Sequence, residues 1–149
     1  MSLFKSAVVA ACALLRGASS ITLPIYDDPT MQPDPTASGN ANGFIVVDVQ
    51  FGEQGPTGGR SAAPGAGGTF YSSPAVVSAS VFVPRGQGDG TAWDQADAIC
   101  DVLREAIVNL SGSNALVFRS VRVSPAPELK DNTHVQVDVI ATAELEAFV

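Results

Sequence analysis

Residues 75–83, AVVSASVFV, carry the pattern that decides the fold. Successive side chains of an extended strand point to opposite faces. Here valine or alanine fills every second position, at Val77, Ala79, Val81 and Val83, and the other face carries Val76, Ser78, Ser80 and Phe82. The segment is therefore predicted to be a strand with one buried face. Pro84 ends it, because proline has no N–H group for the sheet ladder.

A loop and a helix are predicted to follow this strand. The loop over 84–90, PRGQGDG, is rich in residues that fit poorly in a helix or a ladder. Thr91 stands three residues before Asp94, which is the spacing of a capping box at a helix start. Apolar residues then recur every three or four positions, which predicts a helix of about five turns. They are Trp93, Ala96, Cys100, Leu103, Ile107 and Leu110.

Three further segments alternate like 75–83. They are 44–51 (FIVVDVQF), 116–123 (LVFRSVRV) and 134–142 (HVQVDVIAT). The first is expected to form a hairpin with 75–83, and the other two are expected to form a second antiparallel hairpin. Regular alternation places Arg119 and Arg122 on opposite faces of their strand, because they are three residues apart. That spacing argues against a local basic patch.

The first sixteen residues allow two interpretations. One lysine is followed by an apolar run over 7–15 and then by small residues, as in a short secretory signal. The apolar residues also have nearly helical spacing, and Arg16 directly after the run favours a helix of the folded domain. The run is too short to cross a bilayer, which takes about twenty residues.

Two long segments have no regular pattern. Residues 18–43 contain prolines and end in a Ser/Asn/Gly cluster, which predicts an extended or turn-rich crossing without a regular element. Residues 52–69 are rich in glycine and are predicted to be a flexible hairpin tip. With these segments, residues 1–149 are expected to form one domain. Its predicted class is α+β, with an antiparallel or mixed sheet of about four strands packed against two helices in the order α-β-β-α-β-β.

The composition argues against one class of function. The 149 residues carry a formal net charge of −7. Because there is no overall basic surface to neutralise phosphates, specific nucleic-acid binding is not expected. Only 15% of the residues are charged, whereas 46% are hydrophobic. Either part of the surface contacts another chain, or uncharged polar residues cover it.

No group of residues has the pattern of a catalytic or metal site. His134 is the only histidine, there is no Gly-x-Ser-x-Gly segment, and a solvated strand-end histidine is expected. Cys12 and Cys100 lie in apolar helical segments without a Cys-x-x-Cys, which predicts free buried thiols. The glycine-rich loops lack Gly-Lys-Ser/Thr. We therefore expect neither enzyme activity nor a cofactor nor a metal.

Several segments together resemble the tail terminator proteins of long-tailed bacteriophages, also called tail-completion or minor tail proteins. The resemblance rests on FIVVDVQFGE over 44–53, the glycine-rich tip, VVSASVFVPRGQGDGTAWDQADAICDVLREA over 76–106, and the late segments FRSVRV and VQVDVIA. In that family a strand ending in Val-Phe-x-Pro similarly leads through a Gly-x-Gly-x-Gly loop into a helix rich in Ala and Asp. The proline-rich crossing departs from the family, in which an asparagine often stands near the position of Asp28.

The resemblance implies a structural protein of the virion tail or neck, assembled in the host cytoplasm. Family members form a ring, usually of six subunits, that caps the tail tube and offers a docking face to the head-completion complex. The implied partners are therefore other copies of the chain, the tail tube protein and a head-completion or connector protein. DNA passes through the channel without specific binding, which the acidic charge suits. The alternative that stays open is a secreted or periplasmic binding domain with a cleaved N-terminal signal.

The expected contact regions are the two flexible flanks of the strand over 75–83. One is the tip that precedes it, and the other is the loop over 85–90. The residues expected at a subunit or tube interface are Phe51, Glu53, Arg60, Phe70, Tyr71, Arg85 and Asp89.

Overall fold

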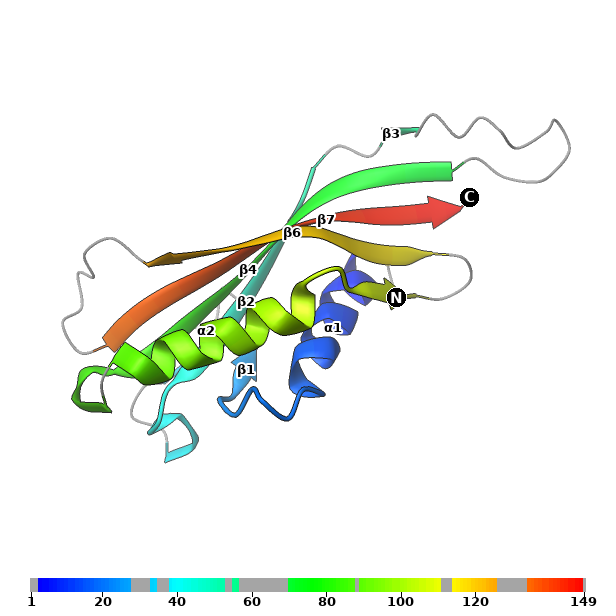
Figure 1. The fold of residues 1–149 in the computed structure, drawn as a ribbon. Helices are drawn as coiled ribbons and strands as arrows, with labels where there is room; N and C mark the ends of the chain where they lie inside the picture. The colour runs from blue at the N-terminus through cyan, green and yellow to red at the C-terminus, as the bar shows by residue number, and fades with distance from the viewer. Residues whose placement is uncertain are drawn as a thin grey trace, which may run out of the picture.

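The fold is a twisted β-sheet with both α helices on one of its faces (Figure 1). The computed structural model describes residues 3–27, 33–34, 38–52, 55–56, 70–87, 89–110, 114–125 and 134–148. Its helices are α1 (Leu3–Arg16) and α2 (Asp89–Leu103), with short 3-10 turns η1 (Ser38–Asn40) and η2 (Arg85–Gln87). The strands are β1 (Ile25–Tyr26), β2 (Phe44–Phe51), β3 (Gly55–Pro56), β4 (Phe70–Pro84), β5 (Ile107–Asn109), β6 (Ala115–Pro125) and β7 (His134–Phe148).

The described strands form one mixed sheet in the order β1-β2-β4-β7-β6-β5, and β3 also pairs with β4. Only β1 is parallel to its neighbour. The predicted sheet of about four strands in the order α-β-β-α-β-β is therefore wrong. β1, β3 and β5 have only two or three residues each, which is too short for an alternating pattern to appear in the sequence.

The two predicted hairpins are confirmed. β2 pairs antiparallel with β4 from Phe44 opposite Phe82 to Phe51 opposite Ala75. β6 pairs antiparallel with β7. The long strands β4 and β7 pair along their whole length and join the two hairpins into one sheet. This central pairing explains why the pattern over 75–83 is the clearest in the chain, since β4 has a strand on each side.

The core lies between the sheet and the helices. We call the side of the sheet that packs against them the helix face. Its side chains are the buried valines, alanines and leucines of β2, β4, β6 and β7. From α1, Ala7, Ala11, Cys12 and Leu15 are completely buried against this face, which confirms the predicted N-terminal helix. No helix in the described ranges has the length and apolar character needed to span a membrane.

α2 is shorter than the sequence predicts, and its exposed side differs. The helix starts at Asp89, before Thr91, and ends at Leu103. Glu105 then takes a φ of 56°, which lies in the left-handed region and stops a helix. Ile107 begins β5 and is 64% exposed. Trp93 is 40% exposed, so it does not belong to the buried side of the helix, which consists of Ala92, Gln95, Ala96, Ala98, Ile99, Cys100 and Leu103.

The side chain of Gln95 attaches the proline-rich crossing to α2. Its Oε1 accepts hydrogen bonds from the backbone N–H groups of Thr22 (3.0 Å) and Leu23 (3.4 Å). Its Nε2 donates to the backbone oxygen of Ser20 at 3.3 Å. A glutamine on the buried side of a helix thus satisfies backbone groups that no strand reaches.

A β-bulge in β6 changes which side chains share a face. Phe118 pairs with Ala143, but Ser120 pairs with Thr142, so Arg119 is an extra residue in the strand. Because of this insertion, Arg119, Ser120 and Arg122 all lie on the face away from the helices. The prediction that the two arginines lie on opposite faces is therefore wrong.

Candidate interaction surfaces

The structure divides the predicted interface residues into two groups. Phe51 ends β2, and Phe70 and Tyr71 begin β4 at the same end of the sheet. Arg85 and Asp89 follow the opposite end of β4. The length of β4 separates Phe70 and Tyr71 from Arg85 by roughly 45 Å at about 3.3 Å per residue, whereas Phe51, which pairs with Ala75, lies about 30 Å from Pro84 along the strand direction. Glu53 and Arg60, like most of the glycine-rich tip over 52–69, lie outside the described residues.

Phe51 contacts α1 at the first end. Its ring lies 4.7 Å from that of Phe4, measured between centroids, in an edge-on arrangement. Phe51 is half-buried, whereas Phe4 is 38% exposed. Further along β4, Tyr71 pairs with Pro56 of β3 and with Ala147 of β7. This end therefore presents partly exposed aromatic surface.

The opposite end carries an aromatic cluster next to the exposed Arg85. Phe44 stacks on Phe82 with 5.0 Å between ring centroids. The rings of His134 and Tyr26 lie 5.9 Å and 6.3 Å from Phe44. His134 is half-buried, so the prediction of a solvated histidine is only partly correct.

We call the side of the sheet that faces away from the helices the open face (Figure 1). In the cross-strand pairing its residues share rows, two of which run Asp48–Ser78–Ile140–Arg122 and Gln50–Val76–Thr142–Ser120. The face combines hydroxyl and charged side chains with apolar ones, such as Ile140 and Val76, which is 41% exposed. Its charged residues are Asp48, Asp138, Glu144 and Glu146 against Arg119 and Arg122, which leaves it acidic.

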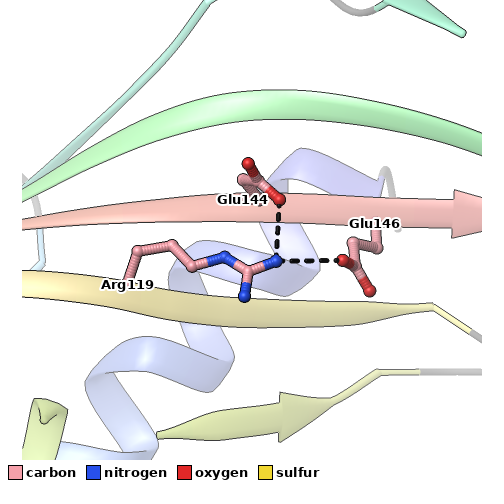
Figure 2. A network of polar contacts seen from close by, with 3 residues as sticks. All are labelled: Arg119, Glu144 and Glu146. Atoms are coloured by element: carbon pink, nitrogen blue, oxygen red, sulfur yellow. Dashed lines mark hydrogen bonds and ion pairs between the residues drawn. The ribbon is translucent and has the colours of Figure 1, made fainter. Parts of the chain in front are cut away.

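Arg119 bridges two acids on the open face (Figure 2). Its Nη2 lies 3.0 Å from Oε2 of Glu144 and 3.7 Å from Oε1 of Glu146. Both acids come from β7, and the bulge brings the arginine beside them. No ion pair among the described residues includes Arg122, which is exposed. The two arginines therefore differ, since one is already engaged within its own chain.

Replacing Arg119 with alanine is expected to change stability little. Both of its ion pairs are solvent-exposed, and pairs of this kind contribute about 0–1 kcal/mol. We expect a loss below about 1 kcal/mol in urea unfolding, with a smaller difference from wild type in high salt. Arg104→Ala is the matched control, because Arg104 forms one exposed pair at 3.5 Å with Asp101. A loss of several kcal/mol would contradict this assignment.

Both cysteines are buried and free, as predicted. Burial raises the pKa of the Cys12 thiol to about 11; the negative charge of Asp27 adds to the effect and Arg16 opposes it. Burial also raises the pKa of Cys100. No group of three metal-ligating side chains occurs within the described ranges.

The thiol of Cys12 is expected to make stability depend on alkaline pH. Its folded-state pKa lies above the ordinary value of 9.0, so the unfolded chain loses the proton first. Stability should therefore be unaffected by this group below pH 9 and fall as the pH rises towards 11. Urea unfolding of the wild type and Cys12→Ala across this range measures the effect. A pH dependence that is the same in both proteins would contradict it.

Comparisons with known proteins find the same fold in other chains. No protein-family model matches the sequence, and no curated protein matches it. A chain from the virion of a native gene transfer agent particle aligns with a TM-score of 0.57 and 18% identity, over 98% of each chain. A second solved structure aligns with a TM-score of 0.61 and 17% identity, over 100% of this chain and 99% of the other. The fold of this chain, along its full length, is therefore one that a virion chain also has.

Two features of these surfaces were missed in the sequence. The bulge at Arg119 does leave a local signal, because the apolar positions that face the core change from Leu116 and Phe118 to Val121 and Val123, which regular alternation does not allow. The role of Gln95 depends on a segment more than seventy residues earlier in the chain. A polar residue on an otherwise apolar helix stripe is the one signal that could have pointed to it.

Proposed function

We propose that this chain is a structural protein of a phage-like virion that acts as a tail terminator. The observation that carries the proposal is the full-length fold shared with a chain of a gene transfer agent virion. The motif over 76–106 that resembles tail terminators adds a second line of support. In this proposal copies of the chain form a ring, usually of six, that caps the tail tube and docks to a head-completion or connector protein.

The arrangement of the candidate surfaces supports a ring. A head-to-tail contact uses two different regions of each subunit, whereas a two-fold dimer uses one region twice. The five described residues of the predicted interface lie in two groups: Phe51, Phe70 and Tyr71 towards one end of the sheet, and Arg85 and Asp89 at the other. The acidic open face suits a wall past which DNA moves without binding, because like charges repel the phosphates.

Imaging and genetics test the proposal together. Purified full-length protein is expected to form closed rings in negative-stain micrographs and a matching oligomer mass in native mass spectrometry. Particles that lack the protein are expected to have tails of irregular length that do not join heads, and supplying the chain should restore them. A protein that stays monomeric at all concentrations and leaves tails unchanged when removed would overturn the proposal.

The exported alternative makes a different prediction about α1. Cleavage after about residue 20 would remove a helix whose Ala7, Ala11 and Leu15 are completely buried in the core. We expect the protein isolated from its native source to retain this helix. Intact-mass measurement distinguishes the two, and a mass lower by about twenty residues would favour export.

A further inference from the structure

We propose that neighbouring copies of this chain join their sheets through two strand edges with which no described strand of the same copy pairs. One edge is residues 47–51 of β2, and the other is residues 119–123 of β6 in the next copy. The inference rests on the ring of the proposed function and names the surface that closes it.

Each of these strands is covered along only part of its outer edge. β1 pairs with β2 at Ile45 and Val46 only, and β5 pairs with β6 from Ala115 to Val117 only. Among the described residues, no strand pairs with the remainder of either edge. Alternate N–H and C=O groups of such an edge point away from the sheet and can bind another strand.

The direction of the two strands suits a head-to-tail contact. Three antiparallel pairings lead from β2 through β4 and β7 to β6, so β2 and β6 run in opposite directions. A second copy placed beside the first in the same orientation brings its β2 antiparallel to the first copy's β6. The contact uses a different edge on each partner, and repeating it can close a ring.

In one register of this contact, residues of similar character lie opposite one another on the same face of the joined sheet. It pairs the valines of both strands on the helix face and the polar residues on the open face. The pairs are Val47–Val123, Asp48–Arg122, Val49–Val121 and Gln50–Ser120. In this register, residues 47–51 of one copy lie opposite residues 119–123 of the next copy. β1 pairs with β2 just before the first segment, and β5 pairs with β6 just before the second, so neither short strand blocks the contact.

The same register continues the rows of the sheet. Asp48 and Arg122 stand at the two ends of one row within a single copy, as do Gln50 and Ser120. Each row of cross-strand neighbours in one copy is therefore continued by the corresponding row of the next copy. The apolar layer beneath the helices continues too, because Val49, Val121 and Val123 are only half-buried in the single chain.

The charges of the two edges make the pairing selective. Arginines and a bulge on an edge strand discourage pairing with arbitrary strands. Arg119 is held by Glu144 and Glu146 of its own chain, whereas Arg122 has no ion pair among the described residues. Asp48 supplies the opposite charge directly across the contact, where cross-strand pairs interact most strongly.

A charge exchange tests the register. Asp48→Arg and Arg122→Asp should each shift ring formation to at least about tenfold higher protein concentration, since each places like charges opposite one another. The double variant D48R/R122D should restore the wild-type concentration dependence in analytical ultracentrifugation. Asp94→Arg, on the exposed side of α2, is the charge-matched control and should leave assembly unchanged. Circular dichroism confirms that each variant is folded.

Cysteine cross-linking provides a second, independent measurement. Within one copy Gln50 and Ser120 are three strand spacings apart, about 14 Å, which is too far for a disulfide. Oxidised Q50C/S120C should therefore give a ladder of linked copies on a non-reducing gel. Q50C/S124C places the second thiol four residues along the same strand, two open-face rows or about 13 Å away, and should link poorly. The native thiols are buried and contribute no cross-link.

The outcomes separate the two proposals. If wild-type rings form but the charge exchange has no effect and Q50C/S120C gives no ladder, the edge contact is wrong and the ring function stands. If the wild type forms no oligomer at any concentration, both are overturned. Restored assembly in the double variant together with a specific ladder confirms the edge contact.

Discussion

Gly43→Ala is expected to lower the free energy of unfolding by about 3 kcal/mol or more. Gly43 has a φ of +118°, a conformation that side chains rarely adopt. It lies between η1 and β2, where its N–H donates to the Asn40 oxygen at 3.0 Å. A methyl group there would collide with the backbone oxygen of Phe82 and crowd Leu23 at 3.3 Å. The backbone of β4 cannot move away, because it pairs with strands on both sides.

Urea unfolding of Gly43→Ala beside Gly86→Ala measures this cost. Gly86 has no atom within 4 Å of an added Cβ, so its substitution should change stability by no more than about 0.5 kcal/mol. The pair controls for the general effect of replacing glycine with alanine in the unfolded chain. Equal stability of the two variants would show that the backbone at Gly43, just before β2, tolerates a side chain, which contradicts the structure.

Gln95→Ala is expected to destabilise the protein by roughly 2–4 kcal/mol. Gln95 is 7% exposed, and its amide serves two backbone N–H groups and one backbone oxygen. Removing the side chain leaves these groups in a largely buried position without a partner, and each unsatisfied group costs about 1–3 kcal/mol. Water that enters the space could bind some of these groups, so the expected loss of stability is smaller than the sum of the three individual costs.

Two further variants make the Gln95 measurement specific. Asp97→Ala, on the exposed side of the same helix, should change stability by less than about 0.5 kcal/mol. At low pH the protonated carboxyl of Gln95→Glu keeps an oxygen that accepts from Thr22 and Leu23 and has an O–H that can donate to the Ser20 oxygen, so this variant should be more stable than alanine there. Hydrogen exchange at Thr22 should accelerate in Gln95→Ala, and unchanged exchange would contradict the assignment.

The long elements of the fold were predictable because their patterns reflect burial. Residues 75–83 alternate since β4 buries one face against the helices, and the apolar spacing of α1 reflects its contact with the same core. The end of α2 was not predictable from spacing alone. Ile107 continues the helical period of Cys100 and Leu103, but Glu105 breaks the helix and β5 pairs with β6 instead. Tertiary pairing overrides local periodicity there.

The candidate surfaces were less predictable than the core. The contact regions predicted from the sequence precede and follow β4, yet this strand, which lies between them, is fifteen residues long. The uncovered edges of β2 and β6 depend on where the short strands β1 and β5 stop. Because those short strands have no recognisable sequence pattern, the sequence does not show which parts of β2 and β6 they leave unpaired.

The bulge at Arg119 also has a consequence for comparing sequences. Without that residue, Phe118, Ser120, Val121 and Arg122 would alternate between the two faces as a regular strand does. Loss or gain of one residue here therefore leaves the apolar core and the pairing with β7 intact. Relatives with the same fold are expected to differ in length by one residue in β6, and an alignment without a gap at this position would exchange core and surface residues for the remainder of the strand.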